Sequence, residues 1–204
     1  MWKRWEKALA LAFILTLLFS AAELGVGLRT QNTMAQKMVR LHVLAASDSE
    51  YDQERKLQVK DAIFSRTEEI LRSVADQQEA EQALSAALPE LELLAEETLQ
   101  RSGAIEEVTV SLVNERFNTR YYDGFTLPAG EYRSLQVIIG EGQGKNWWCV
   151  VFPPLCAASA EEFSCVASGA GLSENEIALI QQGEEGYYLR FRAVELWNRW
   201  MQRH

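Results

Sequence analysis

Residues 133–156 read RSLQVIIGEGQGKNWWCVVFPPLC, and this stretch sets the fold class. Two apolar runs, 133–139 and 147–152, are separated by a glycine-rich segment at 140–146, and the second run ends at Pro153. Short apolar runs bounded by glycine and proline predict strands, and proline cannot donate a hydrogen bond within a central ladder. The stretch therefore predicts two strands joined by a glycine-rich hairpin loop.

Outside this stretch the apolar spacing predicts further strands at 38–44 and 107–113, where residues alternate. A helix is predicted after Ser47, with Ser49 and Asp52 forming a capping box. Helical spacing also predicts a helical region over 77–102, in which Pro89 starts a new helix. It further predicts a short helix at 173–181 and an amphipathic tail helix over 187–203. The order β-α-α-β-β-β-α predicts an α+β domain whose mainly antiparallel sheet of about four strands is backed by helices.

The first 22 residues have the layout of a secretory signal peptide. A basic start is followed by an apolar stretch at 8–19 and by small residues at Ser20 and Ala22. The alternative is an uncleaved membrane anchor that continues through Leu28, which would place Glu23 within the bilayer. We therefore expect a signal peptide or anchor at 1–22, a linker at 23–37 and one α+β domain at 38–204, exported from the cell that makes it.

Composition excludes several classes of function. The chain carries 20 Lys and Arg against 29 Asp and Glu, a net charge of −9, and an acidic surface disfavours binding to nucleic acid. Histidine occurs only at His42 and His204, too few for a cysteine and histidine zinc site, and we expect no metal and no cofactor. Of the three cysteines, Cys149 and Cys156 are our expected disulfide pair, and three buried free thiols are the alternative.

Two patterns resemble catalytic motifs. The glycines at 140, 142 and 144 resemble a phosphate loop, but a strand follows where a helix N-terminus is needed, so we expect no nucleotide site. His42 could serve a hydrolase with Ser47 or Cys149, although no G-x-S-x-G motif is present. The residues indicate no enzyme, and a secreted thiol or serine hydrolase using His42 remains the alternative.

The glycine-rich segment has the composition of a contact surface. Lys145, Asn146, Trp147 and Trp148 place aromatic side chains beside adaptable polar groups, which is common where proteins meet. The alternative is that both tryptophan side chains belong to the core.

Three segments together resemble the stage II sporulation protein R family of endospore-forming bacteria. They are LHVLAASDSEYDQERKLQVKDA at 41–62, FNTRYYDGFTLPAGEY at 117–132 and IGEGQGKNWWCVVFPPLC at 139–156. The run YLRFRAVELW at 188–197 also fits, and the resemblance covers about 38–200 except 76–105 and 157–185.

The resemblance implies a secreted signal of sporulation rather than a protease. Members of the family are exported into the space between the forespore and mother-cell membranes. There they activate a membrane-embedded aspartic protease of the mother cell, which processes the sigma-E precursor. We expect this partner to contact the following residues: Gly140, Glu141, Gly142, Gly144, Lys145, Asn146, Trp147, Trp148, Arg120 and Tyr132.

Overall fold

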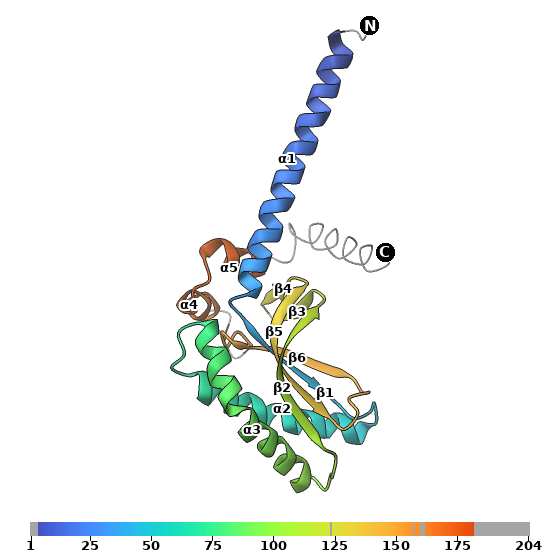
Figure 1. The fold of residues 1–204 in the computed structure, drawn as a ribbon, viewed down its shortest axis with the longest axis vertical. Coiled ribbons are helices and arrows are strands. Elements are labelled where there is room, and N and C mark those ends of the chain that lie inside the picture. Colours follow the sequence, from blue (N-terminus) through green and yellow to red (C-terminus); the bar gives the residue numbers. More distant parts are fainter. Residues whose placement is uncertain (1–3, 123, 157, 160–161, 182–204) are drawn as a thin grey trace.

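The computed structural model describes residues 4–122, 124–156, 158–159 and 162–181, which form the α+β fold predicted from the sequence. The predicted tail helix at 187–203 lies outside the described residues. In chain order (Figure 1) the elements are α1 Arg4–Ala35, β1 Val39–Leu44, α2 Glu50–Leu71, α3 Gln77–Arg101, β2 Val108–Phe117, β3 Arg120–Tyr122, β4 Phe125–Leu127, β5 Gly130–Ile139, β6 Asn146–Phe152, α4 Phe163–Gly169 and α5 Glu174–Gln181.

The main sheet has four strands in the order β2-β5-β1-β6, and β3 and β4 pair separately as a small hairpin. Pairing is antiparallel between β2 and β5 and between β1 and β6, and parallel between β1 and β5. The expectation of a mainly antiparallel sheet is therefore confirmed.

The expectation of a hairpin between β5 and β6 is wrong, because β1 lies between these two strands. Five of the six residues of β1 are buried. A strand that is covered on both faces is most stable at the centre of a sheet. The glycine-rich loop, residues 140–145, consequently crosses the end of β1 instead of closing a hairpin.

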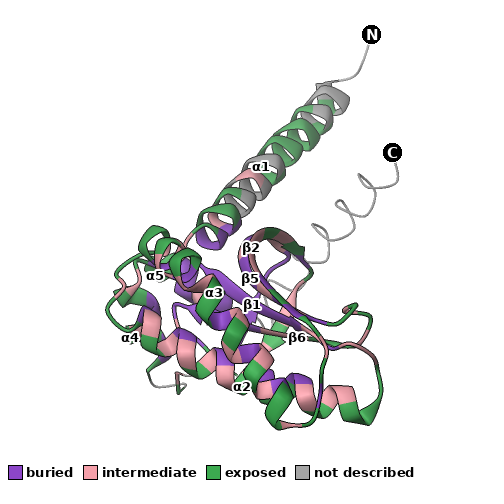
Figure 2. Cartoon of the chain, turned by 60° about the horizontal axis from the view of Figure 1, so that its bottom comes forward, coloured by how far each residue is buried: buried purple, intermediate pink, exposed green. Residues whose placement is uncertain are grey.

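Helices α2 and α3 cover one face of the sheet (Figure 2). Val39, Leu41 and Val43 of β1 are fully buried there, together with residues of both helices. Helix α3 is continuous through Pro89, so the predicted break at that residue is wrong. Pro89 is exposed, while Leu84, Leu91, Ala95 and Leu99 are buried on the opposite side and hold the helix against the sheet.

A second apolar cluster covers part of the other face. The end of α1, the β3–β4 hairpin, α4 and α5 enclose Met34, Phe117, Leu127, Tyr132 and Phe163. The residues expected to form a linker, 23–37, are helical as far as Ala35, and the last turn of α1 is packed in this cluster.

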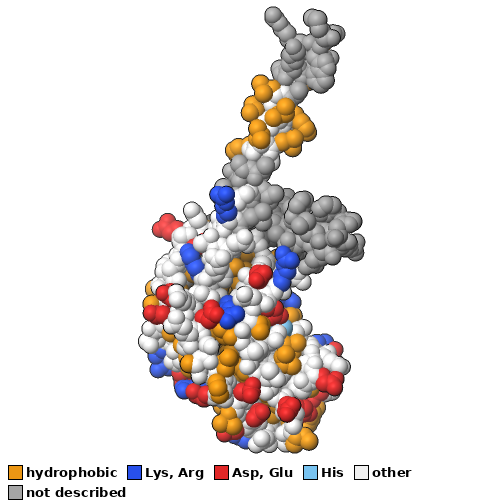
Figure 3. Space-filling view, viewed as in Figure 1, with side chains coloured by type: hydrophobic (Ala, Val, Ile, Leu, Met, Phe, Trp, Pro, Cys, Tyr) orange, Lys and Arg blue, Asp and Glu red, His pale blue; other side chains and the backbone are white. Residues whose placement is uncertain are grey.

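The N-terminal part of α1 projects away from the domain and carries exposed hydrophobic side chains between Leu9 and Phe19 (Figure 3). Among the residues that the structure describes, no helix combines the length and the apolar character that a bilayer span requires.

The cysteines follow the expected pairing. Cys149 and Cys156 form a disulfide with their Cα atoms 6.2 Å apart, and Cys165 is an exposed free thiol. The bond ties the turn after β6 back to the strand, where Val150 N also donates to Cys156 Sγ at 3.2 Å.

Candidate functional surface

The glycine-rich loop is docked onto the residues that follow β1. Gly144 N donates to Ala45 O at 2.9 Å, Gln143 N to Ala46 O at 3.3 Å, and Lys145 N to Asp48 Oδ1 at 2.7 Å. These bonds join two segments that are about 100 residues apart in sequence. The loop therefore has a defined conformation although most of its side chains are exposed.

Two glycines make this docking sterically feasible. A Cβ atom at Gly144 would overlap the carbonyl group of Ser47, so only glycine lets the two backbones approach this closely. Gly142 has φ +63°, and a Cβ there would lie 2.7 Å from Ile138 Cγ2. Gly142 and Gly144, which we expect to contact a partner, therefore also determine the conformation of the loop.

The segment between β1 and α2 is fixed by helix capping with Ser49 as the predicted N-cap, but the predicted capping box is incomplete, because Ser49 N donates to Ser47 Oγ and not to the Asp52 carboxylate. Ser49 Oγ accepts from Asp52 N at 3.1 Å, and Ser47 Oγ donates to Asp52 Oδ2 at 2.5 Å. Gln53 Nε2 donates to Ser47 O at 2.8 Å. Ser47 is therefore engaged in the start of α2 and is not positioned as a nucleophile for His42.

Lys56 holds the backbone of the loop and was not identified from the sequence. Lys56 is 5% exposed, and its Nζ donates to Lys145 O at 3.0 Å and to Gln53 Oε1 at 2.7 Å. Burial lowers the pKa of Lys56, and the charge of Lys145 lowers it further while Asp48 raises it. The spacing of four residues between Lys56 and Lys60 was the available signal, since both lie on one helix face.

His42 lies on the face of the sheet opposite the helices. Its Nδ1 is 3.0 Å from Glu115 Oε2 and its Nε2 is 2.7 Å from Asn146 Oδ1. Its ring stacks on Trp148 with centroids 5.6 Å apart and planes 22° apart. His42 is thus the centre of a polar cluster that connects β2, β1 and β6.

The geometry separates His42 from the expected nucleophiles. Cys149 pairs with Leu41 across β1 and β6, belongs to the apolar cluster on the helix side, and is bonded to Cys156. A dyad of His42 with Cys149 is therefore excluded in this structure, because the two side chains point to opposite faces. Among the described residues, the ring nitrogens of His42 bond only to Glu115 and Asn146, which carry no hydroxyl or thiol.

The adjacent tryptophans of β6 also point to opposite faces. Trp147 packs against the helix-side core and has Lys60 Nζ 5.1 Å from its ring centroid. Trp148 lies on the His42 side, with the guanidinium carbon of Arg120 3.5 Å above its ring. Both rings are half-buried. Arg120 therefore lies at the end of β6 that is next to the glycine-rich loop.

Tyr132 does not lie on this surface. It is 1% exposed, its hydroxyl donates to Pro128 O at 2.8 Å, and burial raises its pKa. Its ring flanks the buried guanidinium of Arg40 at 5.0 Å. The expectation that Tyr132 contacts a partner directly is therefore wrong: a tyrosine at this position of β5 is enclosed by the second cluster.

Arg40 is fully buried without a carboxylate partner among the described residues. Its guanidinium carbon lies 3.9 Å from the Phe117 ring centroid, and its Nη2 is 2.6 Å from the Tyr122 hydroxyl. Within the described part of the chain its Nε and Nη1 have no hydrogen-bond partner, and burial lowers its pKa. The alternation along β1 places Arg40 on the His42 face, but alternation alone does not indicate that another element covers this face at Arg40.

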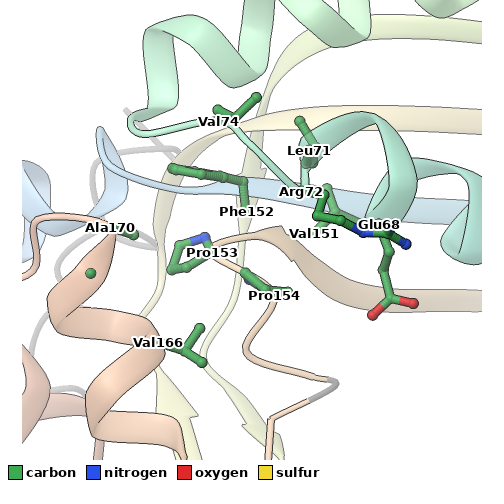
Figure 4. Close-up of a pocket in the computed structure, with 11 residues that line it drawn as sticks. Glu68, Leu71, Arg72, Val74, Val151, Phe152, Pro153, Pro154, Val166 and Ala170 are labelled. Carbon is green, nitrogen blue, oxygen red and sulfur yellow. The ribbon is translucent and has the colours of Figure 1, made fainter.

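A pocket of about 420 Å³ lies at the end of β6, between α2 and α4 (Figure 4). Its walls include Val151, Pro153, Pro154 and Val166, with Glu68 and Arg72 at the α2 side. It contains no histidine or cysteine side chain. In the described part of the chain, no three acidic, histidine or cysteine residues are grouped as metal ligands.

Comparison with known proteins agrees with the segments that carry the resemblance. Residues 35–162 match the model of the family described as stage II sporulation protein R. The chain is 31% identical over 179 residues to stage II sporulation protein R of Bacillus subtilis (strain 168), covering 84% of this chain and 77% of that protein. No solved structure matches. The chain therefore belongs to the stage II sporulation protein R family.

Proposed function

We propose that this sporulation protein is a secreted intercellular signal that activates a membrane-embedded aspartic protease of the mother cell, leading to processing of the sigma-E precursor. Family membership supports a role in sporulation. The finer proposal adds the partner and the reaction that the sequence resemblance implies. Activation by contact requires only that the signal bind the active state of the protease more tightly than the inactive state.

The docked glycine-rich loop is the observation that supports recognition by contact. Its backbone is held by Ala45, Ala46, Asp48 and Lys56, while the side chains of Lys145 and Asn146 are exposed at its end. A surface that is ordered before binding loses less conformational entropy when the complex forms. We propose that the protease contacts this loop and the beginning of β6, together with Arg120.

We further propose that the protein acts without catalysis. The buried His42 is used within the sheet, where it bonds to Glu115 and Asn146. The proposal predicts that His42→Ala retains activity whenever the variant folds and is exported. A catalytic role for His42 would instead abolish activity in the folded variant.

Export is the remaining part of the proposal. Residues 1–22 would direct the chain into the space between the two membranes, either as a cleaved signal peptide or as an anchor. The exposed apolar side chains between Leu9 and Phe19 have the character of the apolar stretch of a signal peptide.

The deciding experiment measures cleavage of the sigma-E precursor in sporulating cells that lack this protein. Cells that regain the full-length chain are expected to restore cleavage, and cells that regain a chain without residues 1–22 are not. The double variant Lys145→Glu, Asn146→Ala is expected to be exported and folded but inactive. Normal cleavage in the deletion strain would overturn the signalling role, and full activity of the double variant would remove the loop from it.

A further inference from the structure

Strand β6 forms one edge of the sheet, so one of its sides has no neighbouring strand among the described residues (Figure 1). Val150 N donates to Cys156 Sγ, on the side away from β1. Backbone groups alternate in direction along an antiparallel strand. The N–H and C=O groups of Asn146 and Trp148 therefore point outward in the same direction as those of Val150.

The turn after β6 covers part of this edge. The disulfide between Cys149 and Cys156 holds the turn against Val150, which leaves Asn146 and Trp148 as the outward-facing positions of β6 that no described strand or turn covers. Natural sheets commonly shield their edges against unspecific pairing. The edge of β6 is thus shielded at one end and open at two outward-facing residues. This restricts the extended segments that can pair with it.

Cations lie on both sides of the open positions. Lys60 lies over Trp147 on one face, and the Arg120 guanidinium lies 3.5 Å above Trp148 on the other. Lys145, immediately before the strand, is exposed. Lys60 is paired with Asp61, but the side chains of Arg120 and Lys145 have no carboxylate partner among the described residues.

Arg120 is the most informative of these cations. Its Nε is buried and has no hydrogen-bond partner among the described residues. Burial lowers the pKa of Arg40, and the positive charge of Arg120 lowers it further. Two guanidinium groups near one another without a carboxylate are unfavourable. Although the chain as a whole has a net charge of −9, the surroundings of these two guanidinium groups therefore have a local deficit of negative charge.

We propose that the partner adds an extended segment to β6 as a further strand, pairing with the backbone of Asn146 and Trp148 and placing an acidic side chain against Arg120 and Lys145. The proposal rests on the proposed function, because it specifies how the protease is recognised. Strand addition obtains affinity from main-chain hydrogen bonds and specificity from side chains on alternating positions. A carboxylate bound to a guanidinium forms stronger hydrogen bonds than a neutral pair.

Charge argues against a second copy of this chain as the occupant. A twofold pairing of β6 with itself would bring the Arg120 and Lys145 side chains of both copies to the same junction. Like charges opposite one another destabilise a strand pair. An acidic segment of another protein relieves the deficit that a second copy would increase.

The test uses proline at an edge position. Trp148→Pro removes one outward N–H and no hydrogen bond to β1, and Trp148→Ala is its reference because it removes the same side chain but keeps the N–H. In the complementation assay, at equal exported amounts, Trp148→Pro is expected to support about tenfold less precursor cleavage than Trp148→Ala, the effect of a lost hydrogen bond of about 1.4 kcal/mol. Equal cleavage by the two folded variants would overturn strand addition.

A second pair of variants keeps the proposal testable if a proline variant does not fold or Trp148→Ala is already inactive. Arg120→Gln removes the proposed partner of the acidic side chain, and Arg101→Gln is the control, since Arg101 is exposed on α3. A loss of about tenfold for Arg120→Gln alone is expected from a charge-assisted bond. Equal cleavage by both variants would overturn the proposal.

These outcomes are separable from failure of the proposed function. If the wild-type chain does not restore cleavage in the deletion strain, the signalling role itself fails. If the wild-type chain restores cleavage and the two comparisons show no difference, only strand addition at β6 is wrong.

Discussion

The face of the sheet that packs against α2 and α3 buries apolar side chains along β1, whereas the opposite face of the same strand buries Arg40 and His42. On the helix side, Val39, Leu41 and Val43 are fully buried. On the other side, Arg40 has two donor atoms without partners among the described residues, and His42 depends on Glu115 and Asn146. Along β1, the helix-side face therefore contributes stability, while the other face holds polar groups whose burial has a cost.

The largest expected effect tests the helix-side face. Leu135→Ala removes a fully buried side chain of β5, and we expect the free energy of unfolding to fall by about 2–5 kcal/mol because a cavity forms in a packed core. Chemical denaturation measures the change. Leu57→Ala, at a position that is 46% exposed, is the control and should change stability by less than about 0.5 kcal/mol. Equal effects at the two positions would contradict the assignment of the core.

The second prediction concerns the glycine-rich loop that connects β5 to β6. Gly144→Ala would force the loop away from the carbonyl of Ser47, and we expect a loss of about 1–3 kcal/mol in unfolding free energy together with reduced activity. Gly169→Ala is the matched control, because Gly169 is exposed in α4 and has no atom within 4 Å of an added Cβ. A Gly144→Ala variant with unchanged stability and activity would show that the loop is not held as described.

The third prediction uses alkaline pH to probe the polar face. Burial raises the pKa of Tyr132 in the folded state, so its hydroxyl keeps its proton where the unfolded chain loses it, above about pH 10. The stability that this group contributes is present below pH 10 and is lost as pH rises, by about 1.4 kcal/mol per pH unit.

Tyr132→Phe should therefore reduce the fall in unfolding free energy between about pH 10 and 11, measured by denaturation at each pH. Comparing the variant with the wild type cancels the contributions of Tyr122 and Lys56, whose pKa values are also shifted by burial. Tyr121→Phe, at a site that is 63% exposed, should leave the slope unchanged. The prediction fails if both variants have the wild-type slope.

The smallest expected effect is at Arg40. Arg40→Met replaces a buried, incompletely bonded cation by an apolar side chain of similar length, and we expect unfolding free energy to change by less than about 1 kcal/mol or to increase. Thermal unfolding of the variant measures this change. A loss of more than about 3 kcal/mol would mean that Arg40 is stabilised by its aromatic neighbours and Tyr122, and that the polar face also contributes to stability.

The pattern of apolar residues in the sequence was sufficient to predict most of the helices and strands. Alternation identified β1 and β2, apolar runs bounded by glycine and proline identified β5 and β6, and Ser49 with Asp52 located the start of α2. The short β3–β4 hairpin and α4 were not predicted, because a strand of three residues cannot establish a period of two and a helix of seven residues hardly establishes a period of 3.6.

The sequence alone also located the glycine-rich loop, Arg120 and the tryptophans of β6, but not how they are arranged. It did not identify Lys56 or Arg40, because burial of a charged side chain depends on what packs over it. The expectation for Tyr132 failed for the same reason. Side chains on one face of a strand share a direction whether or not another element covers them.

What the sequence determined by itself is which residues share a face, because local backbone geometry repeats every two residues in a strand and every 3.6 in a helix. It also determined the family, through segments that retain specific residue order. Only the tertiary structure decided that β1 enters between β5 and β6, that α3 continues through Pro89, and that the glycine-rich loop crosses β1. Strand neighbours are chosen by burial over the whole sheet, and no local period records that choice.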